Sequence, residues 1–195
     1  MKTNNNVYTS IIAGALLCVC SVLMAGYAAK VSLAQQIYHT AKYRLQKDST
    51  PEELSDYWKR SSELYPHNYH LYIFAAENFW YNCDIDTETE DRSRLIAAEM
   101  WCNRGLNANY YSSQLRLLKT HLLEKKSVAA AIEYWEDYVD WHFWSPYNHA
   151  VLVDLYVKSG DFVHASDSLE WVKKTKYYKK TKQKLDNAWE KEMSM

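Results

Sequence analysis

The sequence predicts an all-α protein in which an N-terminal transmembrane helix precedes a row of antiparallel helix hairpins. Three observations carry this prediction. An uncharged apolar run of 19 residues occupies Ile11–Ala29. The chain has only four glycines and three prolines among 195 residues, a composition that suits helices. Apolar residues recur at helical spacing, and the pattern repeats after 34 residues, as between Ala131 and Ala165.

The apolar run is long enough to cross a membrane. A helix rises about 1.5 Å per residue, so the run would reach roughly 28 Å, close to the hydrocarbon thickness of a bilayer. We therefore expect a short N-terminal tail, residues 1–10, and a transmembrane anchor, residues 11–29. A cleaved signal peptide is the alternative, because Gly26, Ala28 and Ala29 offer the small residues of a cleavage site.

Positive charges bear on the orientation of this anchor. Lys2 and the α-amino group favour a cytoplasmic N-terminus, whereas four basic residues after the anchor oppose export of the helical domain. Because short N-terminal anchors generally translocate the chain behind them, we expect the helical domain outside, in the periplasm of a bacterial inner-membrane protein. The four basic residues are Lys30, Lys42, Arg44 and Lys47.

The first pair of helices is expected within residues 31–66. A helix over residues 31–48 would bury one apolar stripe. Thr50, Pro51 and Glu53 then have the spacing of an N-cap, a first helical residue and a capping-box partner, so a second helix begins there and stops near Pro66. The expected stripes are Leu33, Ile37, Ala41 and Leu45 on the first helix and Leu54, Tyr57, Trp58, Ser61 and Leu64 on the second.

The second pair is expected within residues 67–109, with helices over residues 67–82 and 92–105. Its second helix matches the corresponding helix of the next hairpin at the period of 34 residues. Its connection is longer than the turn of the other hairpins, because residues 84–91 are inserted there. The matched positions are Ala97 with Ala131 and Trp101 with Trp135.

The pattern is clearest in the segment that begins at Pro146. If Pro146 is position 1 of a repeat, Leu152 occupies position 7, Tyr156 occupies position 11, and Gly160 falls in the turn between two helices. This arrangement resembles a tetratricopeptide (TPR) repeat. The second helix carries Phe162, Ala165, Leu169 and Val172, and the departures from the family pattern are His149, Val153 and Tyr177.

The TPR resemblance implies an α-solenoid of helix hairpins over residues 31–176. The repeats would cover about residues 31–66, 67–109, 112–145 and 146–176, followed by a capping helix and tail, residues 177–195. A terminal helix must cover its neighbour on one face and meet water on the other. The expected apolar face of the capping helix is Tyr178, Thr181, Leu185 and Trp189.

The resemblance also implies a concave groove, lined by the first helix of each hairpin, that takes an extended peptide or a partner helix. The TPR type that clamps a terminal carboxylate has asparagine at position 9, which none of the last three repeats has, so we expect a protein or peptide partner of another kind. The implied groove residues are His70, Ile73, Glu77, Tyr81, Ser113, Arg116, Thr120, Glu124, Tyr147, Ala150, Asp154 and Lys158.

Two patterns resemble metal sites without completing them. Asp84, Asp86 and Glu88 have the alternate spacing that begins a calcium loop, but Thr89 stands where glycine is needed. We expect a solvated loop there, with a partner contact as the alternative. His67 and His70 lie one helical turn apart, but further ligands are lacking nearby, so we expect no metal.

Two further groups of residues have a structural and a functional interpretation. Cys83 and Cys102 would lie too far apart for a disulfide and are expected to be unpaired. Residues 173–184 contain seven lysines, which fit a solvated helix face; anionic lipid or nucleic acid is the alternative.

The expected function is protein–protein interaction. The net charge of −1 does not favour nucleic acid as a partner, and the sequence has no nucleophile elbow, phosphate loop or dinucleotide fingerprint. We therefore expect a non-enzyme without cofactor or small-molecule substrate, a membrane-anchored scaffold in an envelope complex for secretion or assembly. The alternatives are an exported soluble chaperone or adaptor and a structural subunit of a larger membrane complex.

Overall fold

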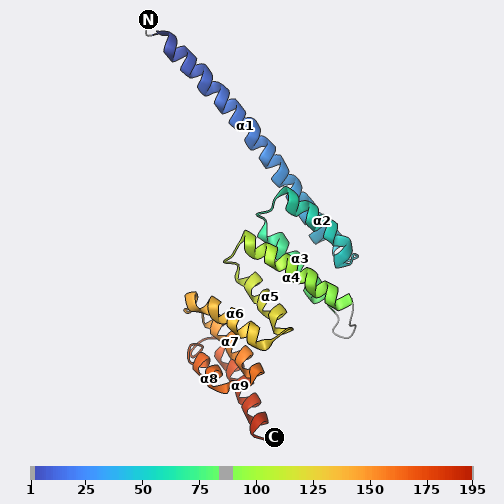
Figure 1. The fold of residues 1–195 in the computed structure, drawn as a ribbon, viewed down its shortest axis with the longest axis vertical. Coiled ribbons are helices and arrows are strands. Elements are labelled where there is room, and N and C mark those ends of the chain that lie inside the picture. Colours follow the sequence, from blue (N-terminus) through green and yellow to red (C-terminus); the bar gives the residue numbers. More distant parts are fainter. Residues whose placement is uncertain (1–2, 84–89, 195) are drawn as a thin grey trace. The chain divides into compact units, whose positions relative to one another are not determined.

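A computed structural model of the protein describes residues 3–83 and 90–194 (Figure 1). Regular secondary structure in this part of the chain is entirely helical, which confirms the predicted fold class. The contacts divide the chain into two compact units, Met1–Tyr110 and Tyr111–Met195, which we call the N-terminal and C-terminal units.

The N-terminal unit is a succession of helices in which each packs on the next. A very long first helix is followed by a π-helical turn and three shorter helices (Figure 1). Their bounds are α1 (Thr3–Thr40), η1 (Ala41–Leu45), α2 (Pro51–Leu64), α3 (Tyr69–Tyr81) and α4 (Glu90–Ala108).

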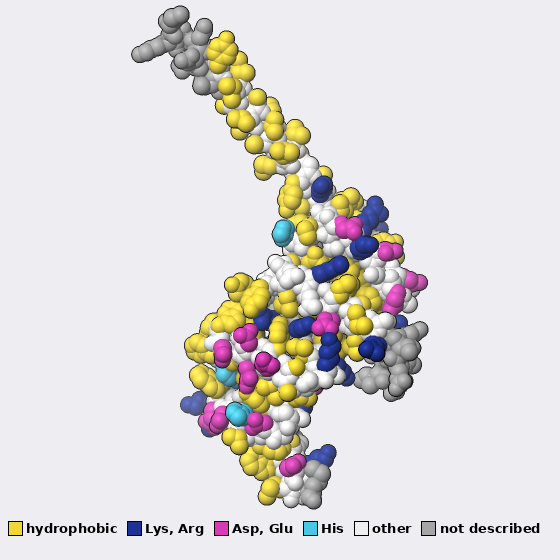
Figure 2. Space-filling view, in the orientation of Figure 1, with side chains coloured by type: hydrophobic (Ala, Val, Ile, Leu, Met, Phe, Trp, Pro, Cys, Tyr) yellow, Lys and Arg dark blue, Asp and Glu magenta, His cyan; other side chains and the backbone are white. Residues whose placement is uncertain are grey.

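The N-terminal part of α1 projects away from the other helices. Every residue from Ser10 to Lys30 is exposed, and Figure 2 shows hydrophobic side chains along this part of the helix. The span Ser10–Leu45 contains a stretch of mean hydropathy 2.2, so it is long and apolar enough to cross a membrane.

The same helix continues into the packed part of the unit. Ala34 and Ala41 are completely buried, and the Ser61 hydroxyl on α2 donates a hydrogen bond of 2.9 Å to the Ala34 carbonyl. The predicted stripe was wrong by one position at its start, because Leu33 is 44% exposed. Small residues let α2 approach α1 closely, and this turns the Ala34 face inward instead of the Leu33 face.

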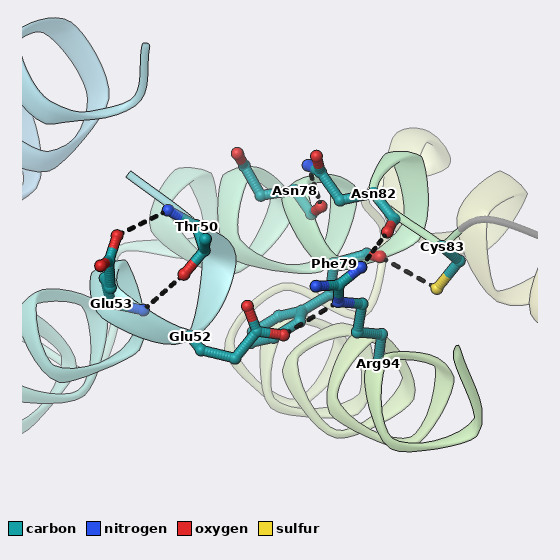
Figure 3. Close-up of polar contacts among 8 residues, drawn as sticks. All are labelled: Thr50, Glu52, Glu53, Asn78, Phe79, Asn82, Cys83 and Arg94. Carbon is teal, nitrogen blue, oxygen red and sulfur yellow. Dashed lines mark hydrogen bonds and ion pairs between the residues drawn. The ribbon is translucent and has the colours of Figure 1, made fainter. Parts of the chain in front are cut away.

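The start of α2 has the predicted capping box (Figure 3). The Glu53 backbone N–H donates to the Thr50 hydroxyl at 3.3 Å, and the Thr50 N–H donates to the Glu53 carboxylate at 2.8 Å. Pro51 is the first helical residue, as predicted. On the predicted stripe, Leu54, Trp58 and Ser61 are buried, Leu64 is half-buried and Tyr57 is exposed.

A contact from α4 ties the ends of α2 and α3 together (Figure 3). The Arg94 guanidinium donates to the Glu52 carboxylate at 2.9 Å and to the Asn82 carbonyl at 2.7 Å. The Asn82 carbonyl is one of the last in α3, where an electron-rich helix end favours a cation. Arg94 therefore holds three helices in register.

Aromatic rings fill the core of the N-terminal unit. Trp58 and Trp101 meet edge to face, with ring centroids 6.3 Å apart. Phe79 packs on Trp58 in the same manner at 5.6 Å. Ala98 is fully buried, whereas the predicted Ala97 is half-buried, so the close-packed position on α4 also differs by one residue from the prediction.

The C-terminal unit contains the five remaining helices. Consecutive helices pack on each other in the pairs α5–α6 and α7–α8, and α9 packs on both α7 and α8. Gly160 ends α7 with a φ of 78°, the left-handed conformation for which glycine is suited. The bounds are α5 (Ser113–Glu124), α6 (Val128–Trp141), α7 (Pro146–Ser159), α8 (Phe162–Glu170) and α9 (Tyr178–Met193).

The core of this unit is built around Trp135 on α6. Its indole N–H donates to the Asn148 carbonyl at 3.0 Å, which links α6 to α7. Ala131 and Ala165 are both completely buried, consistent with the close helix approach that their small size predicts. The predicted face of α9 is partly confirmed: Thr181 and Leu185 are buried, Tyr178 is half-buried and Trp189 remains 45% exposed.

Two other predictions concern the cysteines and the insertion. Cys83 and Cys102 are not joined by a disulfide, as predicted. Cys102 is buried, and the Cys83 thiol donates to the Phe79 carbonyl at 3.1 Å. The calcium-loop comparison concerned the insertion 84–91, of which residues 84–89 lie outside the described residues.

Candidate functional site

The C-terminal unit has a pocket of about 270 Å³ between α5, α7 and α9. Its walls come from the first helix of each helix pair and from the final helix. It therefore lies on the helices that the TPR resemblance assigned to a binding groove. The lining residues are Leu117, His121, Tyr147, Ala150, Val151, Asp154, Tyr177, Lys180, Thr181 and Lys184.

One part of the pocket is apolar and aromatic. Leu117, Ala150 and Val151 supply aliphatic surface, and all three are only half-buried. Tyr147 and Tyr177 form a tilted ring pair with centroids 5.6 Å apart. Burial raises the pKa of Tyr147, with a further contribution from Tyr177, so its hydroxyl stays protonated and can donate a hydrogen bond.

The other part is an ion cluster centred on Asp154. Its carboxylate accepts a hydrogen bond of 2.8 Å from Lys158 and another from Lys184 on α9. Burial acts to raise the pKa of Asp154, but the two ammonium groups outweigh it and the pKa of this carboxyl is lowered. Asp154 therefore stays ionised and links α7 to the terminal helix.

Lys158 extends this cluster to α5. Its ammonium group lies 2.8 Å from the Glu124 carboxylate as well as 2.8 Å from Asp154. Burial alone would lower the pKa of Lys158, but the hydrogen bonds to the two carboxylates raise it. The cluster of Glu124, Asp154, Lys158 and Lys184 thus fixes α5, α7 and α9 around the pocket.

The chemistry of the pocket suits a peptide side chain. Its volume of about 270 Å³ is near the lower end of typical small-molecule sites, which measure roughly 300–1,000 Å³. Lys180 and His121 add polar and cationic groups beside the apolar surface. A peptide that combines an apolar side chain with a neighbouring carboxylate would match both parts of the pocket.

The structure brings the implied groove residues of the last repeat together. Tyr147, Ala150 and Asp154 line the pocket, and Lys158 lies beside it in the ion cluster. From the preceding repeat, Glu124 joins the same cluster through Lys158.

The other implied residues of α5 lie elsewhere. Ser113 is exposed and does not line the pocket, whereas Arg116 and Thr120 are 2% and 0% exposed. The Arg116 guanidinium lies 5.3 Å from the ring centre of Tyr138 and 5.5 Å from that of Tyr134, both on α6. These contacts face the α6 side, so we remove Arg116 and Thr120 from the proposed contact surface.

Sequence reasoning missed the residues of α5 that do face the pocket. Leu117 and His121 follow Arg116 and Thr120 by one position each, so the implied stripe was displaced by about 100° around the helix. The spacing of Leu117, His121 and Glu124 at i, i+4 and i+7 was a signal that would have found them. The residues from Tyr177 and α9 were missed because the resemblance treats that helix only as a cap.

The implied groove residues of the second repeat belong to the N-terminal unit. On α3, Ile73 is 6% exposed, so its side chain is not offered to a partner. Glu77 is half-buried, and His70 and Tyr81 are exposed. None of these four lines the pocket of the C-terminal unit.

The described residues do not include a group of three or more His, Cys, Asp and Glu side chains that could hold a metal. Three of the seven lysines in residues 173–184 have acidic partners: Lys173 pairs with Glu170, Lys182 with Asp186 and Lys184 with Asp154. No protein-family model matches the chain, and no curated protein matches its sequence.

Proposed function

We propose that the protein is a membrane-anchored helical scaffold of the TPR-like kind, which holds a peptide or protein segment in the pocket of its C-terminal unit. The observation that carries this proposal is the pocket between α5, α7 and α9, with apolar surface on one side and fixed charges on the other. The work of such a protein is to keep partners together in an envelope complex for secretion or assembly, with the helical units on the periplasmic side.

The course of α1 supports an anchor that stays attached. The helix runs without interruption from Thr3 to Thr40, and its last turns pack on α2. The cleavage site of the alternative signal peptide would fall within this helix, near Ala29. An exported soluble adaptor would result if cleavage occurred, and the mature N-terminus distinguishes the two forms.

The charge pattern of the pocket favours binding over catalysis. Asp154 is the only carboxylate among the described residues that line it. Hydrogen bonds from Lys158 and Lys184 lower its pKa, which makes it a poor general base near neutral pH. The same pairing makes Asp154 a rigid structural support for Lys184 at the rim.

Affinity capture from solubilised native membranes tests the proposal. Lys180→Glu reverses a charge that lines the pocket, and Lys179→Glu makes the same change one residue earlier, outside the lining. We expect partners that co-purify with the wild-type protein to be retained by Lys179→Glu and lost with Lys180→Glu. Ala150→Phe, which fills the pocket, should lose the same partners. Equal recovery of partners by all variants would refute the pocket as the binding site.

A structural subunit of a larger membrane complex is the second candidate. It is favoured by aromatic side chains at the end of α6 and after α8: Phe143, Trp144 and Trp171 are 51%, 62% and 56% exposed. Exposed aromatic surface of this kind often marks an interface. Expression of the protein alone separates the candidates, because a permanent subunit would aggregate and a scaffold that binds reversibly would remain monodisperse in detergent.

A further inference from the structure

We infer that the N-terminal unit carries a second site, which binds the phosphate of an anionic lipid headgroup at the membrane surface. The site is an open pocket of about 500 Å³ in the angle between α2, α3 and the end of α4. The inference rests on the proposed anchoring of α1 in the membrane and is independent of the peptide pocket. The lining residues are Lys59, Ser62, Glu63, Pro66, His67, Tyr72, Arg104, Asn107 and Ala108.

The contact between α1 and α2 places this pocket along the membrane normal. The hydrogen bond of 2.9 Å between Ser61 and Ala34 sets the two residues at the same level. From Ser61, α2 runs back toward the N-terminal end of α1 (Figure 1). Three further residues, at about 1.5 Å each, bring Leu64 level with about Val31. The turn after α2 therefore lies level with Lys30, where the apolar run has ended.

This level corresponds to the headgroup layer of a bilayer. The polar layer on each side of the hydrocarbon is about 5–8 Å thick. A helix tilt of about 20° would move a neighbouring helix, roughly 10 Å away, by only about 3 Å along the normal. Pro66 and His67, at the turn, would thus remain in or next to the headgroup layer.

The residues at the turn suit an interfacial position. Tyr65 and Tyr69 are half-buried, and His67 and His70 are exposed. Such rings, apolar in body and polar at one end, favour the boundary between lipid and water. The Tyr72 hydroxyl donates to the Pro66 carbonyl at 3.0 Å, which holds the turn against α3 and shapes one wall of the pocket.

Two cations face a phosphate in this pocket. Lys59 and Arg104 are both exposed, and the structure gives neither an ion pair with a described carboxylate. The Arg104 guanidinium is held 5.0 Å from the ring centre of Trp101. Arginine can donate two parallel hydrogen bonds to phosphate oxygens, and lysine adds a mobile charge. Glu63 is the opposing charge in the lining, so the pocket has a net positive charge.

The anchor makes modest affinity sufficient. A headgroup in the same membrane is presented to the pocket at high effective concentration, because both are confined to one surface. Each Lys or Arg near an anionic membrane surface contributes about fivefold in affinity. A free anion lacks this confinement, so the proposed ligand is the lipid and not soluble phosphate.

Native mass spectrometry of the purified full-length protein in mild detergent tests the site. The probe is phosphatidylglycerol, with phosphatidylcholine as the zwitterionic comparison. We expect wild-type protein to bind phosphatidylglycerol at several-fold lower concentration. Lys59→Gln should weaken that preference by about fivefold, and the further change Arg104→Gln should abolish it. Glu63→Gln should strengthen binding.

The matched control is Lys179→Gln with Lys191→Gln, which removes two exposed positive charges from α9 in the other unit and should preserve the preference. Equal binding by the control and the Lys59→Gln, Arg104→Gln variant would overturn the inference. Displacement of the lipid by inorganic phosphate at the concentration of the lipid itself would also overturn it, because the site would then select a soluble anion. Extraction of the wild-type protein from membranes by alkaline carbonate would refute the anchor, which is a separate failure.

Discussion

The Ser61 hydroxyl lies 2.9 Å from the Ala34 carbonyl, in a buried contact between α2 and the helix that carries the apolar run. Ala34 is only five residues beyond Ala29, the last residue of that run. The packed N-terminal unit therefore begins about one and a half helical turns after the proposed membrane segment. A membrane anchor of this form would hold the unit close to the bilayer and restrict its rotation.

Replacement of Ser61 tests the close approach of α1 and α2. Ser61→Leu forces a larger side chain into a fully packed site and should destabilise the protein by about 1–3 kcal/mol. Thermal unfolding of the detergent-solubilised protein measures this effect. Ser32→Leu, on the exposed side of the same segment of α1, is the control. Equal unfolding midpoints for the two variants would contradict the packing described here.

Removal of the capping hydroxyl should destabilise α2. Thr50→Ala leaves the Glu53 N–H without its side-chain acceptor and should cost about 1 kcal/mol. Thr50→Ser keeps an acceptor and should retain most of the stability. Chemical unfolding followed by circular dichroism checks the order, and an alanine variant as stable as the serine variant would argue against the capping box.

The ion cluster predicts a pH dependence. The pKa of Asp154 is lowered from its ordinary value of 3.8, so its contribution to stability is present above pH 3.8 and is lost as the pH falls through the folded-state value. The pKa of Lys158 is raised above 10.5, so its contribution is lost only as the pH rises beyond that value. Asp154→Asn should thus destabilise the protein at pH 7, and its difference from wild type should shrink below about pH 4. A constant difference from pH 7 to pH 3 would contradict the assignment.

Arg116 should behave as a core residue. Arg116→Ala removes its contacts with Tyr134 and Tyr138 and should destabilise the C-terminal unit by about 2–4 kcal/mol. Arg116→Lys keeps the charge but loses the planar group that lies over the rings, so it should be intermediate. Unfolding of the purified variants measures this effect. A fully stable alanine variant that fails to bind a partner would return Arg116 to the binding surface.

Local sequence signals predicted the ends of helices better than their buried faces. Thr50 with Glu53, and Gly160, specify backbone conformations through their own side chains or through the lack of one, and both appear where expected. Leu33 and Ala97 were predicted to be buried, but the neighbouring Ala34 and Ala98 are. The helix that packs closest decides which of two adjacent apolar residues turns inward, and a single helix does not carry that information.

The pocket could be predicted only in part for a related reason. Tyr147, Ala150 and Asp154 follow from the resemblance of α7 to a TPR helix, and they line the pocket. Lys180 and Lys184 enter it through the packing of α9 on α7, a tertiary contact that the sequence pattern does not specify. Arg116 was assigned to a polar surface because of its charge, but the rings of α6 bury it.

The mass of the intact protein isolated from washed native membranes tests the central claim most directly. The account predicts a protein that resists extraction by alkaline carbonate and retains residues 1–29, because α1 both enters the membrane and packs on α2. A soluble protein whose sequence starts near Lys30 would contradict the anchored scaffold and establish the exported adaptor in its place.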